Sequence, residues 1–338
     1  MVENLTSPFE KIRHIPSYEE VAKKVERRYV KLDSKLKELR NVKVRNKEMQ
    51  RIGLVYSIIY DTLDNIVKTL PHVDKIHPFY RDLLDILVGV KEYRRAILRL
   101  ANAREIVKKI RKECMNLMKL AQEPKDYAHI RRSCIGRMMS VLRRNKKYID
   151  FLASFMVKLR KIPSIDPEVP TIIVAGMPQV GKSTLVKAIS TAEPEIASYP
   201  FTTKNLVVGH IFLKPEGKIQ VIDTPGLLDR PLSERNPIEL QAIMALKHVK
   251  GIILYLFDIS IGCYYTLEEQ IRVFEEILSS FNKPVKVALN KIDAKDENRV
   301  AKVRDYLKER GFEKVYEISA KKGIGLKELL DDLLKDLT

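Results

Sequence analysis

The sequence predicts two domains of different class: an all-α helical bundle, followed by an α/β domain with a mostly parallel sheet and helices on both faces. Three observations predict this arrangement. Apolar residues recur at helical spacing through residues 1–161, short apolar runs alternate with helical segments in residues 171–338, and a proline-marked linker separates them at residues 162–170. A chain of 338 residues can bury two cores of this size.

Helical spacing is clearest in the segment that begins at Ile97. Its apolar and small side chains follow one another at steps of three and four residues, which forms one narrow stripe along a helix. The stripe comprises Ile97, Leu100, Ala103, Val107, Ile110, Cys114 and Leu117. Because Cys114 lies in the stripe, we interpret it as a core residue and not as a reactive thiol. Prolines separate this segment from other helical ones, and long helices with short breaks are typical of a bundle.

Positive charge is concentrated in the first half of the chain. Residues 1–170 hold 38 Lys and Arg against 21 Asp and Glu, a net charge of +17, whereas residues 171–338 hold 24 against 23. A basic domain beside a neutral one favours a polyanionic partner, although a solvated, lysine-rich helical surface explains the same composition. No apolar run is long enough for a membrane span, and three widely spaced cysteines indicate neither a disulfide framework nor a zinc site. These features fit a cytoplasmic protein.

Strands and helices alternate in the second domain. Strands are expected at residues 171–175, 205–212, 218–223, 251–257, 285–290 and 315–319, with helices beginning near Lys182, Pro237, Thr266, Asp296 and Gly325. Two of these helices have polar start signals: Asn236 with Glu239, and Thr266 with Glu269, each predict a capping box. Ligands on such a sheet bind at the carboxyl ends of the strands.

A phosphate-binding loop is predicted directly after the first of these strands, where GMPQVGKST fits G-x-x-x-x-G-K-[ST]. Gly176 and Gly181 permit a tight loop whose backbone N–H groups point at phosphate oxygens, and the following helix adds its positive N-terminal end. Lys182 supplies a cation for the β- and γ-phosphates, and the Ser183 hydroxyl is placed to bind Mg²⁺. The expected nucleotide-binding residues of this loop are Gly176, Gln179, Val180, Gly181, Lys182, Ser183 and Thr184. The second domain is therefore predicted to be a P-loop nucleotide-binding domain.

The base is expected to be guanine, because NKID begins at Asn290, where the strand at residues 285–290 ends. Guanine presents two donors on one edge, and the Asp293 carboxylate can accept both, whereas it repels the N1 acceptor of adenine. Further along, ISAKKG brings the backbone of Ser319 and Ala320 within reach of the guanine 6-oxo group. We expect the base of GTP or GDP to be bound by Asn290, Lys291, Asp293, Ser319 and Ala320.

Two further strings are expected to respond to the γ-phosphate. In DTPGLLD, Asp223 ends a strand and is expected to hold Mg²⁺ through water, while the Gly226 N–H meets the γ-phosphate. In YPFTT, Thr203 is the expected metal ligand, with Thr202 as the alternative. Together with Ser183, the predicted metal ligands are therefore Thr203 and Asp223.

Leu227 follows the glycine of DTPGLLD, at the position where the best-known switch GTPases carry a glutamine that orients the attacking water. A leucine side chain can neither donate nor accept a hydrogen bond. We therefore assign catalysis to Lys182, Thr203 and Gly226, and we expect a Mg²⁺-dependent, glutamine-independent GTPase that is slow alone. The alternative is an RNA-binding module in which GTP is a structural or regulatory ligand with negligible turnover.

With these motifs, the chain resembles the Obg-related branch of GTPases and, within it, the nucleolar GTP-binding protein family. The strings that carry the resemblance include HPFYRDLLDIL from His77, FTTKNLVVGHI from Phe201, RNPIELQAIMALKH from Arg235 and DISIGCYYTLEEQ from Asp258. The resemblance implies a helical domain followed by an α/β P-loop GTPase domain, and a role in assembly of the large ribosomal subunit through binding of ribosomal RNA.

The resemblance also implies a potassium ion near the phosphates as a second candidate cofactor. Gln179 stands where the family commonly has asparagine, and it offers the same amide on a longer stem. Eukaryotic members continue well past the GTPase domain, whereas this sequence ends one helix after ISAKKG. An archaeal-type minimal form in the cytoplasm is therefore expected in place of a nucleolar protein.

The expected RNA-binding face lies in the segment RRSCIGRMMSVLRRNKK, where a core stripe alternates with cations on the remaining arc of a helix. The proposed cations are Arg131, Arg132, Arg137, Arg143, Arg144, Lys146 and Lys147. A merely solvated helix face is the alternative. Stable membrane association is not expected, because the apolar stripe is narrow and the chain lacks tryptophan anchors.

Overall fold

The computed structural model describes residues 8–9, 14–39, 42–159, 165–197, 206–213 and 217–337. The chain divides into two compact units. A helical unit comprises residues 8–76 and 88–160, and a sheet unit comprises residues 77–87 together with residues 161–338. No helix in the described ranges is long and apolar enough to cross a membrane.

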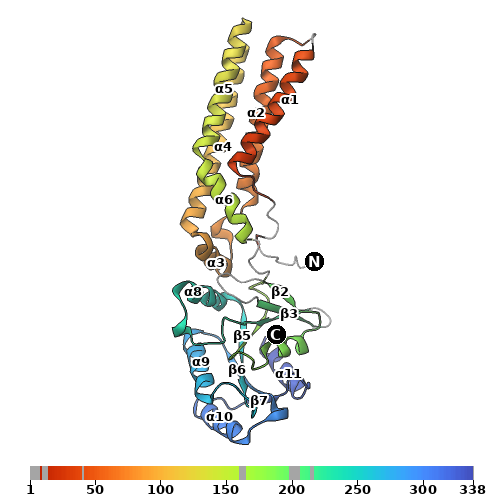
Figure 1. The fold of residues 1–338 in the computed structure, drawn as a ribbon, viewed down its shortest axis with the longest axis vertical. Coiled ribbons are helices and arrows are strands. Elements are labelled where there is room, and N and C mark those ends of the chain that lie inside the picture. Colours follow the sequence, from red (N-terminus) through yellow and green to blue (C-terminus); the bar gives the residue numbers. More distant parts are fainter. Residues whose placement is uncertain are drawn as a thin grey trace. The chain divides into compact units, whose positions relative to one another are not determined.

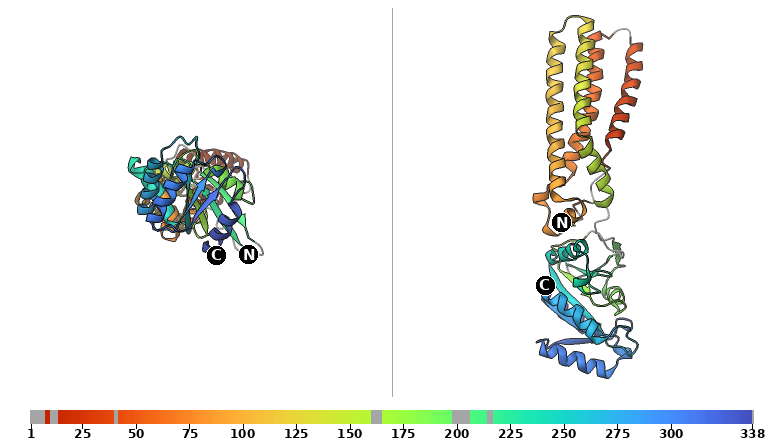
Figure 2. Two further views of the ribbon diagram at one scale, coloured as in Figure 1. Left: turned by 90° about the horizontal axis from the view of Figure 1, so that it is seen from below. Right: turned by 60° about the vertical axis from the view of Figure 1, so that its left-hand side comes forward.

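The helical unit is built from α1 (Tyr18–Glu38), α2 (Val44–Thr69), α4 (Val90–Leu120), α5 (Pro124–Arg144) and α6 (Lys146–Leu159), with a 3₁₀ turn at Val73–Lys75. The long helices α2, α4 and α5 pack against one another, and α1 packs on α2 (Figures 1 and 2). The first helix starts at a capping box formed by Ser17 and Glu20. The predicted bundle is confirmed.

The stripe predicted on α4 is buried in the bundle core from Ile97 through Cys114. Its last position is wrong: Leu117 is 50% exposed, and Met118 is buried in its place. At 3.6 residues per turn, a step of four from Cys114 stays closer to the centre of the stripe than a step of three. Cys114 is therefore a core residue, as the pattern indicates.

A polar cluster joins α1, α2 and α5 inside the bundle. Arg51 Nη2 lies 2.7 Å from Asp33 Oδ1, and Arg51 Nη1 lies 3.0 Å from Glu48 Oε1. The second oxygen of Glu48 lies 2.6 Å from Arg131 Nε, and Arg131 Nη1 also donates to the Tyr29 hydroxyl at 2.6 Å. Because buried charges are stable only when paired, this cluster holds the three helices at defined positions along one another.

The sheet unit contains a seven-stranded sheet with the order β2-β3-β4-β1-β5-β6-β7. Its strands are β1 (Thr171–Ala175), β2 (Glu195–Ala197), β3 (Leu206–Phe212), β4 (Lys218–Asp223), β5 (Gly251–Asp258), β6 (Val285–Asn290) and β7 (Val315–Ile318). The five strands β4, β1, β5, β6 and β7 are parallel, and the β2–β3–β4 edge is antiparallel. All strands expected from the sequence are present, and the short edge strand β2 was not predicted.

Helices α7 (Lys182–Ile189), α8 (Pro237–Ala245), α9 (Leu267–Ser280), α10 (Glu297–Glu309) and α11 (Leu326–Leu337) complete the sheet unit. They cover both faces, with α9 and α11 on opposite sides of the sheet in Figure 1. The Thr266–Glu269 capping box is confirmed. The one predicted at Asn236 is only half present: Asn236 caps α8, but the Glu239 carboxylate bonds to Arg230 at 3.2 Å instead of returning to the cap.

Helix α3 (Pro78–Val88) belongs to the sheet unit, although it lies within the range expected for the helical domain. The Tyr80 hydroxyl donates to the Ile165 carbonyl oxygen at 2.5 Å, and Asp82 Oδ2 lies 3.0 Å from His248 Nε2. Ile165 precedes β1 and His248 precedes β5, so α3 is tied to segments at the amino ends of the parallel strands. The expected sites at the carboxyl ends lie at the opposite edge.

Candidate nucleotide site

Loops at the carboxyl ends of β1, β4, β5, β6 and β7 form the site. The first is the phosphate loop, residues 176–184, which follows β1 and includes the first residues of α7. Gly176 and Gly181 have φ angles of 139° and 101°, and added Cβ atoms would lie 2.6 Å from the Leu256 carbonyl oxygen and 2.3 Å from Asn290 Nδ2. Glycine is therefore required at both positions on steric and conformational grounds.

Lys182 is buried against the phosphate loop. Its ammonium group donates to the Gly176 and Met177 carbonyl oxygens at 2.7 and 2.9 Å. These contacts hold the ammonium group against the loop. The N-terminus of α7 adds partial positive charge at the same loop. Among the other expected loop residues, Val180 is buried, and Gln179 and Thr184 are exposed. Gln179 has a φ of 64°, an uncommon conformation for a residue with a side chain.

Ser183 and Asp223, the two described metal-ligand candidates, are in direct contact. The Ser183 hydroxyl donates to Asp223 Oδ2. Asp223 is fully buried, and its Oδ1 has no hydrogen-bond partner within the described part of the chain. Burial raises the pKa of the Asp223 carboxyl above its ordinary value, an effect that the Ser183 hydrogen bond and the Lys182 charge only partly offset. An unsatisfied buried carboxylate oxygen beside a hydroxyl fits a Mg²⁺ ion, which prefers oxygen ligands.

Thr203, the third expected metal ligand, and its alternative Thr202 lie outside the described residues. The structure therefore brings together Lys182, Ser183 and Asp223, and it leaves the assignment of Thr203 as a prediction.

The residues expected to bind the base lie on two adjacent loops after β6 and β7. Asn290 links three segments, since its Nδ2 donates to the Val180 carbonyl oxygen at 2.7 Å and its Oδ1 accepts from the Ala320 N–H at 3.0 Å. The Ser319 hydroxyl donates to Asp293 Oδ1 at 2.7 Å, and this bond is the main reason why the pKa of Asp293 lies below its ordinary value. Asp293 is thus held as an ionised acceptor.

Lys291, the remaining member of the NKID string, forms an ion pair with a residue that sequence reasoning missed. Its ammonium lies 2.5 Å from Asp258 Oδ2 at the end of β5. Asp258 is positioned by Gln270 of α9, whose amide accepts from the Asp258 N–H at 2.8 Å and donates to its carbonyl oxygen at 3.1 Å. Both residues belong to the string DISIGCYYTLEEQ, where Asp258 is the first residue and Gln270 the thirteenth. The buried amide of Gln270 is the only feature of this string that points to the contact.

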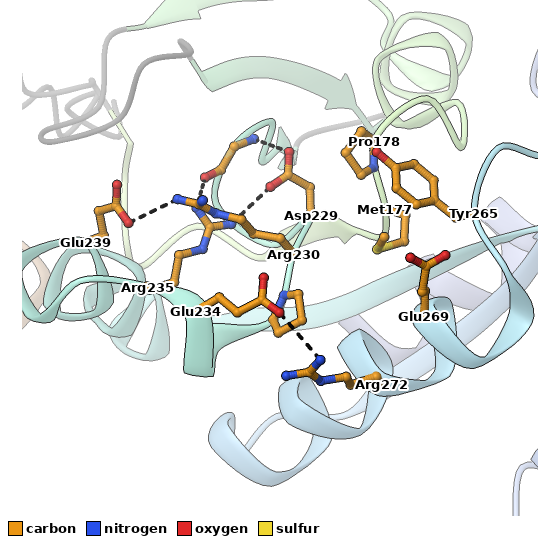
Figure 3. A pocket seen from close by; sticks show the side chains of 12 residues that line it. Met177, Pro178, Asp229, Arg230, Glu234, Arg235, Glu239, Tyr265, Glu269 and Arg272 are labelled. Carbon is orange, nitrogen blue, oxygen red and sulfur yellow. Dashed lines mark hydrogen bonds and ion pairs between the residues drawn. The ribbon is translucent and has the colours of Figure 1, made fainter.

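The turn after β4 contains Gly226 and Leu227. The Thr224 hydroxyl anchors this turn by donating to the Val174 carbonyl oxygen at 2.8 Å. Leu227 is 1% exposed, so its side chain packs in the interior. The Gly226 N–H donates to Asp229 Oδ2 at 2.7 Å, and Arg235 binds the same turn (Figure 3). Neither Asp229 nor Arg235 was singled out from the sequence.

The seven cations of the expected RNA-binding face differ in their surroundings. Arg131 is part of the bundle's polar cluster, Arg137 lies 2.7 Å from Glu113, and Lys146 lies 2.8 Å from Glu19. The other four are exposed, and none of them forms an ion pair with another described residue: Arg132, Arg143, Arg144 and Lys147. Arg131 thus serves to join helices and is a poor candidate for binding a ligand.

Both parts of the chain match known protein families. The family model of the NOG1 N-terminal helical domain matches residues 9–166, and that of nucleolar GTP-binding protein 1 (NOG1) matches residues 237–293. A crystal structure assigned to nucleolar GTP-binding protein 1 of Plasmodium falciparum is 38% identical, with a TM-score of 0.46, over 52% of this chain and 90% of that one.

Two relatives show how far the similarity extends. An uncharacterized protein of Methanocaldococcus jannaschii is 39% identical over 297 residues, which cover 87% of this chain and 83% of that protein. Nucleolar GTP-binding protein 1 of Caenorhabditis elegans is 40% identical over 248 residues, which cover 72% of this chain and 36% of that protein. The chain therefore spans only about a third of the worm protein. From the matches to both family models and to these relatives, we conclude that the chain belongs to the nucleolar GTP-binding protein 1 family.

Proposed function

We propose that the chain binds GTP with Mg²⁺ and hydrolyses it slowly to GDP and phosphate, and that its helical unit binds ribosomal RNA during assembly of the large ribosomal subunit. The observation that carries the nucleotide part is the connection made by Asn290. It joins the phosphate loop to the loop of Ser319 and Ala320, so that phosphate and base positions are fixed relative to each other.

Guanine selectivity is assigned to Asp293. Its carboxylate is ionised and oriented by Ser319, and it offers acceptors for the N1–H and 2-amino donors of guanine. Adenine would place its N1 acceptor against this carboxylate and leave both groups unpaired, which is a strong basis for discrimination. Lys291, held by Asp258, lies beside this site and keeps its stem available for contact with the nucleotide.

Ser183 and Asp223 are the residues that would hold Mg²⁺, with Thr203 as the proposed third ligand. The ion would neutralise developing negative charge on the β- and γ-phosphates when bound. Lys182 adds a second positive charge at the same phosphates. The Gly226 N–H is the proposed donor to the γ-phosphate, and a potassium ion near Gln179 is proposed as an additional cofactor.

Slow hydrolysis is expected because no described side chain of the turn is free to orient water. Leu227 is buried and apolar, so the water has to be oriented by a backbone group, a bound cation or a docked partner. The same observation favours the second candidate, an RNA-binding module that uses GTP as a regulatory ligand. A single-turnover assay with GTP, Mg²⁺ and potassium separates the two, since only a GTPase releases phosphate at a rate that depends on the protein.

The proposed RNA surface includes a shallow groove on α4 that sequence reasoning did not identify. The groove has a volume of about 360 Å³ and is lined by Lys91, Arg94, Arg95, Leu98, Arg99 and Asn102. Arg94 is paired with Asp74, whereas Lys91, Arg95 and Arg99 are exposed and make no ion pair within the described ranges. Unpaired cations in a row are suited to successive phosphates of a nucleic-acid backbone.

Charge on the neighbouring helix α6 supports this assignment. Desolvation raises the pKa of Tyr148, but the positive charges of Lys147, Arg95 and Arg99 outweigh it and lower the pKa below its ordinary value. Lys147 of the expected face therefore acts on the same phenol as two arginines of the groove. The exposed Leu98 adds an apolar contact for a base or sugar at its centre.

The RNA part is tested with the full chain and a structured fragment of large-subunit ribosomal RNA. Replacing Arg95 and Arg99 by glutamine is expected to weaken binding and to lower the slope of log K against log salt by about 0.9 for each phosphate that the protein no longer neutralises. The matched control replaces Lys108 and Lys109, which are exposed further along the same helix and carry the same charge. Equal effects of the two double variants, or preference for anionic vesicles over RNA, would contradict this surface.

A further inference from the structure

The Gly226 N–H, proposed above as a γ-phosphate donor, is already bonded within the protein. It donates to Asp229 Oδ2 at 2.7 Å, and the Asp229 side chain is only 7% exposed. Gly226 has a φ of 79°, so the turn adopts a conformation that favours glycine. A carboxylate three residues further along the turn thus occupies the donor that a γ-phosphate oxygen would need.

Arg235 holds this arrangement in place. Its Nη2 lies 3.0 Å from Asp229 Oδ1 and 2.8 Å from the Leu227 carbonyl oxygen, and its Nη1 donates to the Gly226 carbonyl oxygen at 2.5 Å. Figure 3 shows Arg235 and Asp229 side by side, joined by a dashed line. The guanidinium therefore fixes the orientation of the turn as well as the position of the carboxylate.

Both charges of the pair are buried, which makes them dependent on each other. The Arg235 side chain is 3% exposed, and this burial lowers the pKa of its guanidinium below the ordinary value. A buried charge without its partner is strongly destabilised, so Asp229 is released easily only when another anion compensates Arg235. Arg235 is in turn fixed by its place in the chain, next to the helix cap Asn236.

The pair also adjoins the phosphate loop. Asp229, Arg235 and Gly226 line one pocket of about 590 Å³ together with Met177 and Pro178 of that loop (Figure 3). The Asp229–Gly226 contact therefore borders a pocket that the phosphate loop also borders. Of the two guanine nucleotides, only GTP has a third phosphate to place there.

We propose that Asp229 competes with the γ-phosphate of GTP for the Gly226 N–H, and that Arg235 is the positioning residue that keeps Asp229 in this role. The inference rests on the proposed function, because it assumes a guanine nucleotide at the phosphate loop. GDP leaves the Asp229–Gly226 bond intact, whereas GTP has to displace it. The pair therefore lowers the preference of the protein for GTP over GDP and sets how readily the turn closes on the triphosphate.

The test measures the affinities of the full chain for GDP and for a GTP analogue with a β,γ-imido bridge, by calorimetry in the presence of Mg²⁺. Asp229→Asn keeps the shape of the side chain but removes its charge. A hydrogen bond to a charged acceptor is about twice as strong as one to a neutral acceptor, so we expect affinity for the analogue to rise about 10-fold. Affinity for GDP is expected to change less than about 2-fold.

A matched control removes one negative charge from the same pocket without touching Gly226. Glu234 lines the pocket and pairs with Arg272 at 3.5 Å, so Glu234→Gln should leave the ratio of the two affinities unchanged. If Asp229→Asn does not fold, Arg235→Lys examines the pair from its other end. It retains the charge but cannot reach all three acceptors, and it is expected to raise the ratio about 3-fold.

The outcomes separate this inference from the proposed function. If the wild-type protein binds both nucleotides and the ratio is the same in wild type, Asp229→Asn and Arg235→Lys, Asp229 does not compete with the γ-phosphate. If Glu234→Gln raised the ratio of the two affinities as much as Asp229→Asn does, the inference would also be overturned, because the effect would then come from the charge of the pocket alone. If the wild-type protein binds neither nucleotide, the proposed function itself is wrong.

Discussion

Asn290 reaches from the end of β6 to the phosphate loop, where its Nδ2 donates a hydrogen bond to the Val180 carbonyl oxygen at 2.7 Å. The space between them is so small that a Cβ atom on the adjacent Gly181 would collide with the same amide. Two loops that are more than a hundred residues apart in sequence are thereby joined at the site. A nucleotide that contacts both would bind to a surface that needs little rearrangement.

The first prediction concerns base selectivity. Asp293→Asn replaces an acceptor with a donor amide, so the variant should bind GTP at least 10-fold more weakly than wild type does. It should bind xanthosine triphosphate more tightly than wild type does, because the 2-oxo group of that base suits the amide. Calorimetry with both nucleotides measures the change. Asp305→Asn, on the exposed face of α10, is the control. Unchanged GTP affinity in Asp293→Asn would remove this residue from the site.

The second prediction separates the two phosphate-loop side chains. Lys182→Ala removes a buried charge at the loop and should reduce triphosphate affinity at any Mg²⁺ concentration. Ser183→Ala should leave affinity without Mg²⁺ almost unchanged and abolish most of the gain that Mg²⁺ provides. Titration of each variant at several Mg²⁺ concentrations distinguishes the two roles. Wild-type behaviour in both variants would rule out the loop as the phosphate site.

The third prediction uses the raised pKa of Asp223. Because folding favours the protonated form, its contribution to the free energy of unfolding is greatest at low pH and is lost as pH rises through the folded-state pKa, which lies above 3.8. At neutral pH, Asp223→Asn should therefore stabilise the protein while it abolishes Mg²⁺-dependent triphosphate binding.

Thermal unfolding of wild type and Asp223→Asn across the acidic to neutral range checks this. The stability gained by the variant should grow as pH rises, because the wild-type carboxylate then becomes charged in a buried position. A variant that is less stable than wild type at neutral pH would show that the buried carboxylate is satisfied by contacts which the amide cannot reproduce.

Much of the fold follows from sequence, for reasons visible in particular residues. Strands β1 and β5 are mostly apolar and almost entirely buried, and α9 starts at a capping box, so the positions of these elements were predicted closely. Strand β2 has only three residues, and Ile196 in its centre is 73% exposed, so no apolar pattern marks it. Its pairing with β3 depends on the tertiary structure.

Sequence motifs singled out Lys182, Asn290 and Asp293, and their assignment to a nucleotide site stays a prediction. Contacts were missed where packing determines which partner a side chain meets. Arg131 falls on the polar arc of α5, but its partner Glu48 lies on another helix. Asp229 looks like any turn carboxylate, and only the structure shows that it accepts from Gly226.

The fourth prediction addresses the missing glutamine. Leu227→Gln should not accelerate hydrolysis, because position 227 is 1% exposed and faces the interior. A buried amide without partners should instead lower the free energy of unfolding by about 1–3 kcal/mol. Leu227→Met is the control and should cost less than about 1.5 kcal/mol. Faster phosphate release by the Gln variant would contradict the assignment of Leu227 to the core.

The fifth prediction concerns potassium and Gln179. Glycine readily adopts the φ of 64° found at this position, and asparagine tolerates it, so both substitutions should preserve the conformation of the loop. If the amide helps bind the ion, wild type and Gln179→Asn should hydrolyse GTP faster in potassium than in sodium chloride at equal ionic strength, and Gln179→Gly should abolish this difference. Equal rates in both salts for wild type would exclude a potassium site.

Helix α3 has a consequence for how the protein is made. Its Tyr80 and Asp82 contact Ile165 and His248, which follow 85 and 166 residues later in the chain. During synthesis at about 5–20 residues per second, the second of these residues is therefore added about 8–33 seconds after Asp82. Such contacts between distant residues slow folding. All residues of the helical unit have therefore been made while α3, which interrupts that unit in sequence, still lacks its partners from the later part of the chain.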